Sequence, residues 1–178
     1  GYDFVEQHVP SSGKVLDLGC GYGLFCNYLG LTSEQRRVTG VELNGRKLRH
    51  ADKGLKNVSF KNSDILAEPV TDYYDCIVLL HVLHHLKSFM EQEAIVSKCV
   101  QMLNSGGRLV ILEVDDHPLS KYWLAHVVDH LLYPMQKIFY RLPECMEKLL
   151  RGVGLAVESY PMHKGRPFPH FLYVGQKI

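Results

Sequence analysis

Short apolar runs alternate with segments of helical periodicity along this chain. Strand-like runs cover 14–18, 37–42, 58–62, 75–80 and 107–113, and helical spacing covers 22–30, 45–53, 88–103 and 143–151. Strands that alternate with helices are typical of βαβ units, whose parallel strands form one sheet. Two further strands, near 155–160 and 170–177, flank a turn-rich loop. They predict an antiparallel hairpin at the edge of that sheet.

A glycine-rich turn follows the first predicted strand. The sequence V-L-D-L-G-C-G-Y-G spans 15–23. Glycine lets the backbone approach a ligand closely, so a turn of this kind between strand and helix is typical of a cofactor site. The dinucleotide fingerprint G-x-G-x-x-G does not fit, because Leu24 takes the place of its third glycine and Asp17 would repel a pyrophosphate. A P-loop is excluded because no G-K-[ST] follows. The carboxylate of Asp17 instead suits a cofactor with an ammonium and a sulfonium.

The motif D-L-G-C-G-Y-G resembles the first motif of class I S-adenosylmethionine-dependent methyltransferases. Further matches follow in order: V-T-G-V-E-L at 38–43, N-V-S-F-K-N-S-D-I at 57–65, H-V-L-H-H-L at 81–86 and L-N-S-G-G-R-L-V-I-L-E at 103–113. The chain is similar to the broad group that includes ubiquinone and menaquinone biosynthesis methyltransferases. The resemblance implies a Rossmann-like, doubly wound α/β fold. We expect a mostly parallel seven-stranded sheet with an antiparallel C-terminal hairpin and helices on both faces.

The resemblance also implies which residues hold the methionine part of S-adenosylmethionine. Gly19, Cys20 and Gly21 would offer backbone groups to it. The carboxylate of Asp17 would face its amino group, directly or through water. A loop that only packs tightly would explain the glycines alone, but not the matches that follow them.

Contacts to the ribose and the adenine are implied in the same way. Glu42 ends the second strand and is followed by Leu43, so both carboxylate oxygens can accept from the two ribose hydroxyls. Asp64 would accept from the adenine amino group, and Ile65 would pack on the ring. Asp64 also suits a helix N-cap, and the two roles are compatible.

Three histidines follow the fourth predicted strand, at positions 81, 84 and 85. Ligands of open α/β sheets bind at the carboxyl ends of the strands. We therefore expect His81 near the cofactor and His84 facing the methyl acceptor as a catalytic group. We expect no metal site, because neither these histidines nor the pair His126 and His130 has an evident third ligand or a cysteine at ligand spacing.

The sequence E-V-D-D-H-P at 113–118 lies at the same predicted edge. Asp116 and His117 can orient or deprotonate an acceptor hydroxyl, which makes His117 the second candidate catalytic residue. A plain turn before Pro118 explains the same residues without chemistry. Both interpretations remain open.

The segment 119–142 is apolar at helical spacing and carries few charges. Leu119, Trp123, Val127 and Leu131 would share one face, and a helix this apolar needs cover. We expect a helical insertion that caps an apolar acceptor site. A plain core helix, a homodimer contact and a contact with a membrane surface are the alternatives.

Composition narrows the class of protein. A chain of 178 residues fits a single methyltransferase domain over 1–178. The net charge of +1 gives no overall attraction to nucleic acid, and the eight basic residues within 36–61 are scattered as on a solvated face. Five cysteines without a C-x-x-C pair indicate free thiols in a reducing, cytoplasmic compartment. We expect no transmembrane segment and no signal peptide.

The sequence therefore predicts an S-adenosylmethionine-dependent methyltransferase (EC 2.1.1.-) with a small-molecule acceptor. Oxygen, nitrogen and carbon all remain open as the methylated atom. An N-P-P-Y-type tetrapeptide is missing after the fourth strand, which weighs against methylation of amides and nucleobase amino groups. The alternatives are a non-catalytic S-adenosylmethionine-binding scaffold or regulator, and an RNA or protein methyltransferase.

Overall fold

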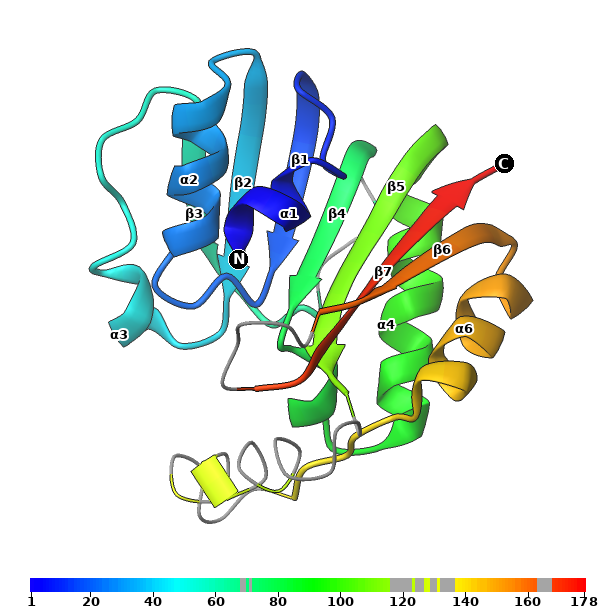
Figure 1. Cartoon of the computed structure of the whole chain (residues 1–178). Coiled ribbons are helices and arrows are strands. Elements are labelled where there is room, and N and C mark those ends of the chain that lie inside the picture. Colours follow the sequence, from blue (N-terminus) through cyan, green and yellow to red (C-terminus); the bar gives the residue numbers. More distant parts are fainter. Residues whose placement is uncertain are drawn as a thin grey trace.

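The computed structural model describes residues 1–67, 70, 72–115, 123, 127–128, 131, 137–162 and 168–178. Its centre is a seven-stranded sheet of order β3-β2-β1-β4-β5-β7-β6 (Figure 1). The strands are β1 (Gly13–Leu18), β2 (Arg36–Glu42), β3 (Val58–Asn62), β4 (Tyr74–Leu80), β5 (Leu103–Val114), β6 (Leu155–Pro161) and β7 (His170–Lys177). β7 runs antiparallel to both β5 and β6, and the other pairs are parallel. The predicted Rossmann-like sheet is confirmed.

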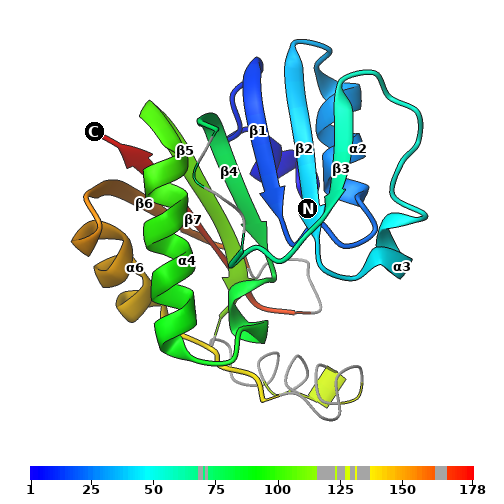
Figure 2. The same cartoon turned by 180° about the vertical axis from the view of Figure 1, so that it is seen from behind.

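Helices cover both faces of this sheet. α1 (Tyr2–Glu6) and α2 (Leu24–Thr32) lie on one face, and α4 (Phe89–Met102) and α6 (Pro143–Gly152) lie on the other (Figures 1 and 2). Two short elements sit at the carboxyl ends of the strands: α3 (Gly45–Leu48) and the 3-10 turn η1 (Leu83–His85). α3 is shorter than the predicted helix, and α1 and η1 were not predicted. One turn of helix carries too little periodicity to be read from sequence.

The sheet separates two apolar clusters. Leu16 and Leu18 of β1 point toward the cluster that contains α4, whereas Val15 points toward the cluster that contains α2. Strands covered on both faces read as continuous apolar runs. This is why β1 and β4 were visible in the sequence.

Three described residues of the predicted apolar face of the insertion are exposed. Trp123, Val127 and Leu131 have helical backbone, and they are 60%, 51% and 75% exposed. Leu119, the fourth member of the predicted apolar face, lies outside the described residues. Within the residues that the structure describes, no helix is long and apolar enough to cross a membrane. The role as a cap stays a prediction.

A buried arginine ties the first helix to the sheet. Arg36 is 2% exposed, and its guanidinium donates to Glu6 Oε1 and Thr32 Oγ1 at 2.6 Å and to the carbonyls of Pro10 and Leu29 at 2.7 and 3.2 Å. A planar guanidinium serves acceptors in several directions, which an ammonium cannot do. Arg36 therefore fixes how α1, α2 and β2 meet.

We expect Arg36→Lys to lower the free energy of unfolding by about 2 kcal/mol, because buried acceptors lose their donors. Arg37→Lys is the matched control, since the Arg37 side chain is exposed and makes no hydrogen bond or ion pair with any residue that the structure describes. Urea unfolding followed by circular dichroism measures both. Equal stability of the two variants would contradict a tethering role for Arg36.

Candidate cofactor and active site

A cavity of about 450 Å³ lies at the carboxyl ends of β1, β2 and β4. Its wall is formed by Gly19, Glu42, Leu43, Asn44, Lys47, Asp64, Ile65, His81, Val82, His85 and Leu86. Parallel α/β sheets bind ligands at this edge, where neighbouring crossovers leave the sheet in opposite directions. In this sheet that position lies between β1 and β4. The cavity therefore lies where the fold predicts a ligand.

The glycine turn forms one end of this wall. Gly19, Gly21 and Gly23 have φ angles of 78°, 58° and 68°, a region that favours glycine. The amides of Gly19 and Cys20 donate to the Val41 carbonyl at 2.7 and 3.0 Å, which ties the turn to β2. A Cβ on Gly19 would lie 2.6 Å from Val82 Cγ2, whereas a Cβ on Gly21 would meet open space.

We expect Gly19→Ala to lower stability by about 2 kcal/mol and to weaken cofactor binding, because left-handed strain adds to the clash with Val82. Gly21→Ala has comparable backbone strain without the clash, so it separates the two effects. Thermal unfolding and titration with S-adenosylhomocysteine measure them. Equal losses of stability in both variants would contradict the contact with Val82.

Glu42 is fixed in place by the backbone. Its side chain is largely buried, and its two oxygens accept from the amides of Gly21 at 2.9 Å and Asn44 at 2.8 Å. It makes no ion pair with any residue that the structure describes. A carboxylate held this way at the end of β2 can accept from neighbouring hydroxyls of a ligand.

Asp17 lies beneath the turn rather than on the cavity wall. It is 2% exposed and accepts from Cys26 Sγ at 3.1 Å. Burial raises the pKa of the Asp17 carboxyl to about 6, and the nearby Glu42 adds to the rise. Neither the Asp17 nor the Glu42 carboxyl has a cationic partner among the described residues, so this pair of carboxyl groups fits a ligand that brings positive charge.

Asp64 and Ile65 follow β3 on the far side of the cavity. Asp64 Oδ1 accepts from the Leu66 amide at 2.8 Å. Residues 65–67 form a turn and not a helix, so this contact stabilises a turn where a helix N-cap was expected. Asp64 is exposed, and Ile65 is partly buried on the apolar cluster of α4. Both side chains line the cavity and are available to a ligand there.

The histidines after β4 take different places. His81 and His85 line the cavity, whereas His84 is 3% exposed and donates from Nδ1 to Glu113 behind it. Sequence reasoning did not single out His85 as the histidine on the wall. The signal was the spacing, because His81 and His85 are four positions apart, as on one face of a helical turn. His117 lies outside the described residues.

Four further wall residues were not predicted: Asn44, Lys47, Val82 and Leu86. They follow the ends of β2 and β4, and only the three-dimensional course of α3 and η1 brings them to the cavity. Within the described part of the chain, no group of three or more histidine, cysteine, aspartate or glutamate side chains could hold a metal ion.

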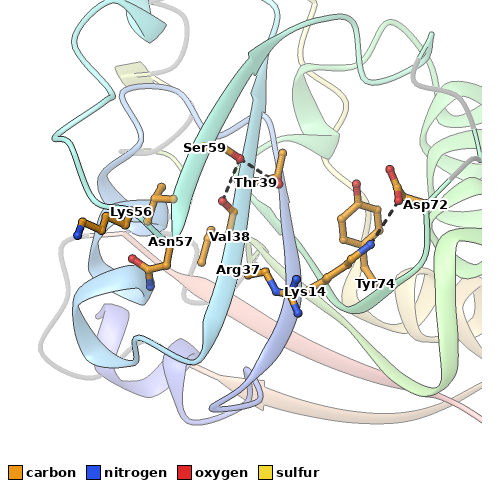
Figure 3. Close-up of a pocket in the computed structure, with 10 residues that line it drawn as sticks. Lys14, Arg37, Val38, Thr39, Lys56, Asn57, Ser59, Asp72 and Tyr74 are labelled. Carbon is orange, nitrogen blue, oxygen red and sulfur yellow. Dashed lines mark hydrogen bonds and ion pairs between the residues drawn. The ribbon is translucent and has the colours of Figure 1, made fainter.

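A second cavity, of about 300 Å³, lies where β1, β2, β3 and β4 begin (Figure 3). It is lined by Lys14, Arg37, Val38, Thr39, Lys56, Asn57, Val58, Ser59, Asp72 and Tyr74. Lys14 and Asp72 form an exposed ion pair of 3.4 Å in this cavity, and such pairs contribute little to stability. The described site residues predicted from sequence do not line it, so the candidate site is the larger cavity.

Fold and cavity together define an α/β cofactor-binding domain with its ligand site at the strand ends. Residues 3–160 match the sequence model of a family described as a methyltransferase domain. The chain belongs to this family and is a class I S-adenosylmethionine-dependent methyltransferase domain.

Two curated relatives give the context. The ubiquinone biosynthesis O-methyltransferase of Xylella fastidiosa is 31% identical over 134 residues, which cover 70% of this chain and 51% of that protein. The ubiquinone/menaquinone biosynthesis C-methyltransferase UbiE of Yersinia enterocolitica is 34% identical over 124 residues, which cover 64% and 48%. The chain thus spans about half the length of these relatives.

Solved structures share the fold. The N-methyltransferase NodS from Bradyrhizobium japonicum, in complex with S-adenosylhomocysteine, has a TM-score of 0.76 at 19% identity and covers 99% of this chain and 85% of its own. Magnesium protoporphyrin IX methyltransferase from Synechocystis, also with S-adenosylhomocysteine, has a TM-score of 0.75 at 17% identity, with 99% and 80% covered. At this identity the likeness is one of fold.

Proposed function

We propose that this domain transfers the methyl group of S-adenosylmethionine to an apolar small-molecule acceptor. The observation that carries the proposal is the convergence of Gly19, Glu42, Asp64 and His81 on one cavity. These residues come from the ends of four different strands. A dinucleotide site would need room for a pyrophosphate, and the buried carboxyl of Asp17 disfavours it.

In this proposal each end of the cofactor has its own partners. The backbone of Gly19, Cys20 and Gly21 holds the methionine end, and Asp17 faces the amino group through the turn. Glu42 accepts from both ribose hydroxyls once its oxygens are shared with the ligand.

The adenine ring of the cofactor lies on the opposite wall of the cavity. Asp64 accepts from the adenine amino group, while Leu43 and Ile65 enclose the ring. His81 lies beside the methyl group. These assignments follow the class and the positions of the side chains on the cavity wall.

Methyl transfer from S-adenosylmethionine needs few catalytic groups from the protein. S-adenosylmethionine supplies an electrophilic methyl group when it is bound, so the domain needs to align an acceptor and exclude water. A base is required only when the acceptor must lose a proton. His85 is the histidine on the wall next to His81 that can take such a proton, with His84 supporting it from behind. His117 remains a second candidate base.

Apolar surfaces support an apolar acceptor. Val82 and Leu86 contribute apolar side chains to the cavity wall, and the insertion 119–142 would cover the acceptor. The two curated relatives are named for quinone biosynthesis, and one structural neighbour is named for a porphyrin. Both kinds of acceptor are largely apolar.

Transfer of labelled methyl from S-adenosylmethionine tests the proposal. We expect incorporation into an apolar phenol or catechol from an acceptor panel, and none into transfer RNA or a protein pool. Label in RNA or protein alone would contradict the small-molecule acceptor. Saturable cofactor binding without turnover on any acceptor would favour a scaffold.

A further inference from the structure

A single carboxylate holds the wall segment that carries the histidines. Glu113, near the end of β5, is 6% exposed. Its Oε1 accepts from the amides of Val82 at 3.0 Å and Leu83 at 2.8 Å, and its Oε2 accepts from His84 Nδ1. Three consecutive residues of β4–η1 are therefore fastened to one side chain of the neighbouring strand.

The charge on Glu113 is consistent with this clamp. Burial raises the pKa of the carboxyl, but His84, His81 and the Leu83 amide outweigh burial and leave the pKa below its usual value. The side chain is therefore ionised at neutral pH and accepts with both oxygens. An ionised acceptor at Oε2 keeps the proton of the His84 ring on Nδ1.

The segment held by Glu113 begins with a backbone conformation that is unfavourable without support from its surroundings. His81 has a φ of 57°, which is uncommon for a residue other than glycine. Such a conformation persists only where the surroundings hold it. His81 and His85 flank the clamp, and both face the cavity.

The same clamp reaches the end of the insertion. Gln92 is fully buried and donates to the carbonyls of Leu83 at 3.0 Å and Phe139 at 2.8 Å. The Phe139 amide donates to the His84 carbonyl at 2.9 Å. The Tyr140 ring stacks on the His84 ring, with 5.4 Å between the two ring centroids. The last residues of the insertion are therefore attached to the back of η1.

We propose that Glu113 is a positioning residue for methyl transfer, which acts through His84 and η1 to aim His85 and His81 at the acceptor. This inference rests on the proposed function. Glu113 touches neither cofactor nor acceptor in it, because His84 and η1 stand between Glu113 and the cavity. Its loss should change the alignment of the reacting groups more than the binding of the cofactor.

Glu113→Gln is the test variant, because an amide of the same shape cannot accept at both ends. The two backbone amides can only donate, so the amide oxygen would stay with them and the NH₂ group would face His84 Nδ1, from which the neutral ring can move its proton to Nε2. We expect kcat to fall at least about tenfold, with the affinity for S-adenosylhomocysteine within about threefold of wild type. Glu34→Gln is the control, since Glu34 is exposed and makes no contact of this kind.

Long-range ¹H–¹⁵N spectra of the ligand-free protein give a readout that a merely structural role would not move. We expect a proton on His84 Nδ1 in the wild type and in Glu34→Gln, and its loss from Nδ1 in Glu113→Gln. Wild-type kcat in Glu113→Gln, or affinity for S-adenosylhomocysteine falling in step with kcat, would overturn the proposal.

The wild-type spectrum keeps the proposal testable even when the variant does not fold. A His84 ring without a proton on Nδ1 overturns the clamp regardless of any variant. Absence of methyl transfer by the wild type would instead be a failure of the proposed function. The Nδ1 readout, which needs no cofactor, separates the two failures.

Discussion

Replacing Glu42 with alanine is expected to weaken the binding of S-adenosylmethionine by about 100-fold or more. Each hydrogen bond to a charged group is worth about 1.5 kcal/mol or more, and two ribose hydroxyls would lose their acceptor. The carboxylate is already oriented by the amides of Gly21 and Asn44, so the wild type binds without reordering it. Isothermal titration of both proteins measures the change.

Two further variants make this result specific. Glu42→Gln keeps one acceptor oxygen, but its NH₂ group would face the backbone amide of Gly21 or Asn44, so its affinity should lie between those of the wild type and Glu42→Ala. Glu34→Ala removes an exposed carboxylate that makes no contacts within the described structure and should bind as the wild type does. Unchanged affinity in Glu42→Ala, with a fold intact by circular dichroism, would remove the ribose assignment.

Asp17→Asn is expected to stabilise the protein while weakening cofactor binding. The folded chain keeps the Asp17 proton up to about pH 6, whereas the unfolded chain loses it near 3.8. Folding thus takes up a proton in that window, and stability falls as pH rises through it. Above pH 6 the ionised, buried carboxylate lowers the free energy of unfolding by its full amount, about 3 kcal/mol. Asparagine removes this charge but buries an NH₂ group, which has a cost of its own. We therefore expect the free energy of unfolding of Asp17→Asn, measured by urea unfolding at pH 7.5, to exceed that of the wild type by about 2 kcal/mol.

The affinity for the cofactor should change with pH in the direction opposite to stability. The cofactor's amino group would lower the pKa of Asp17, so wild-type affinity should rise as pH rises through about 6. Asp17→Asn should abolish this pH dependence and bind about tenfold more weakly at pH 7.5. Asp72→Asn is the control, because Asp72 is 61% exposed. Affinity of Asp17→Asn equal to that of wild type across this range would contradict the amino-group contact.

The fold was largely predictable because buried parallel strands leave a continuous apolar signal. β1, β2, β3 and β4 were located within a residue of their observed ends. β1 and β4 are continuous apolar runs because layers cover both of their faces. β5 starts earlier than predicted, at Leu103, because its first residues are polar and glycine-rich and only the pairing of Tyr74 with Leu103 reveals them.

The residues at the ends of β2 and β3 that line the cavity were easier to predict than the histidines after β4. Strand ends fix Glu42 and Asp64 directly, so position in the sequence gives position at the edge of the sheet. The histidines depend instead on the three residues of η1 and on a buried partner, Glu113, that comes from another strand. Local spacing cannot decide which ring faces the cavity when a distant carboxylate sets the rotation of the turn.

Titration of the wild-type protein with S-adenosylmethionine tests whether the cavity at the strand ends is a site for this cofactor. We expect saturable binding to one site, at a concentration well below millimolar, with S-adenosylhomocysteine competing for it. Nicotinamide and flavin dinucleotides should not compete. An absence of binding at millimolar S-adenosylmethionine would contradict this assignment, whatever the acceptor.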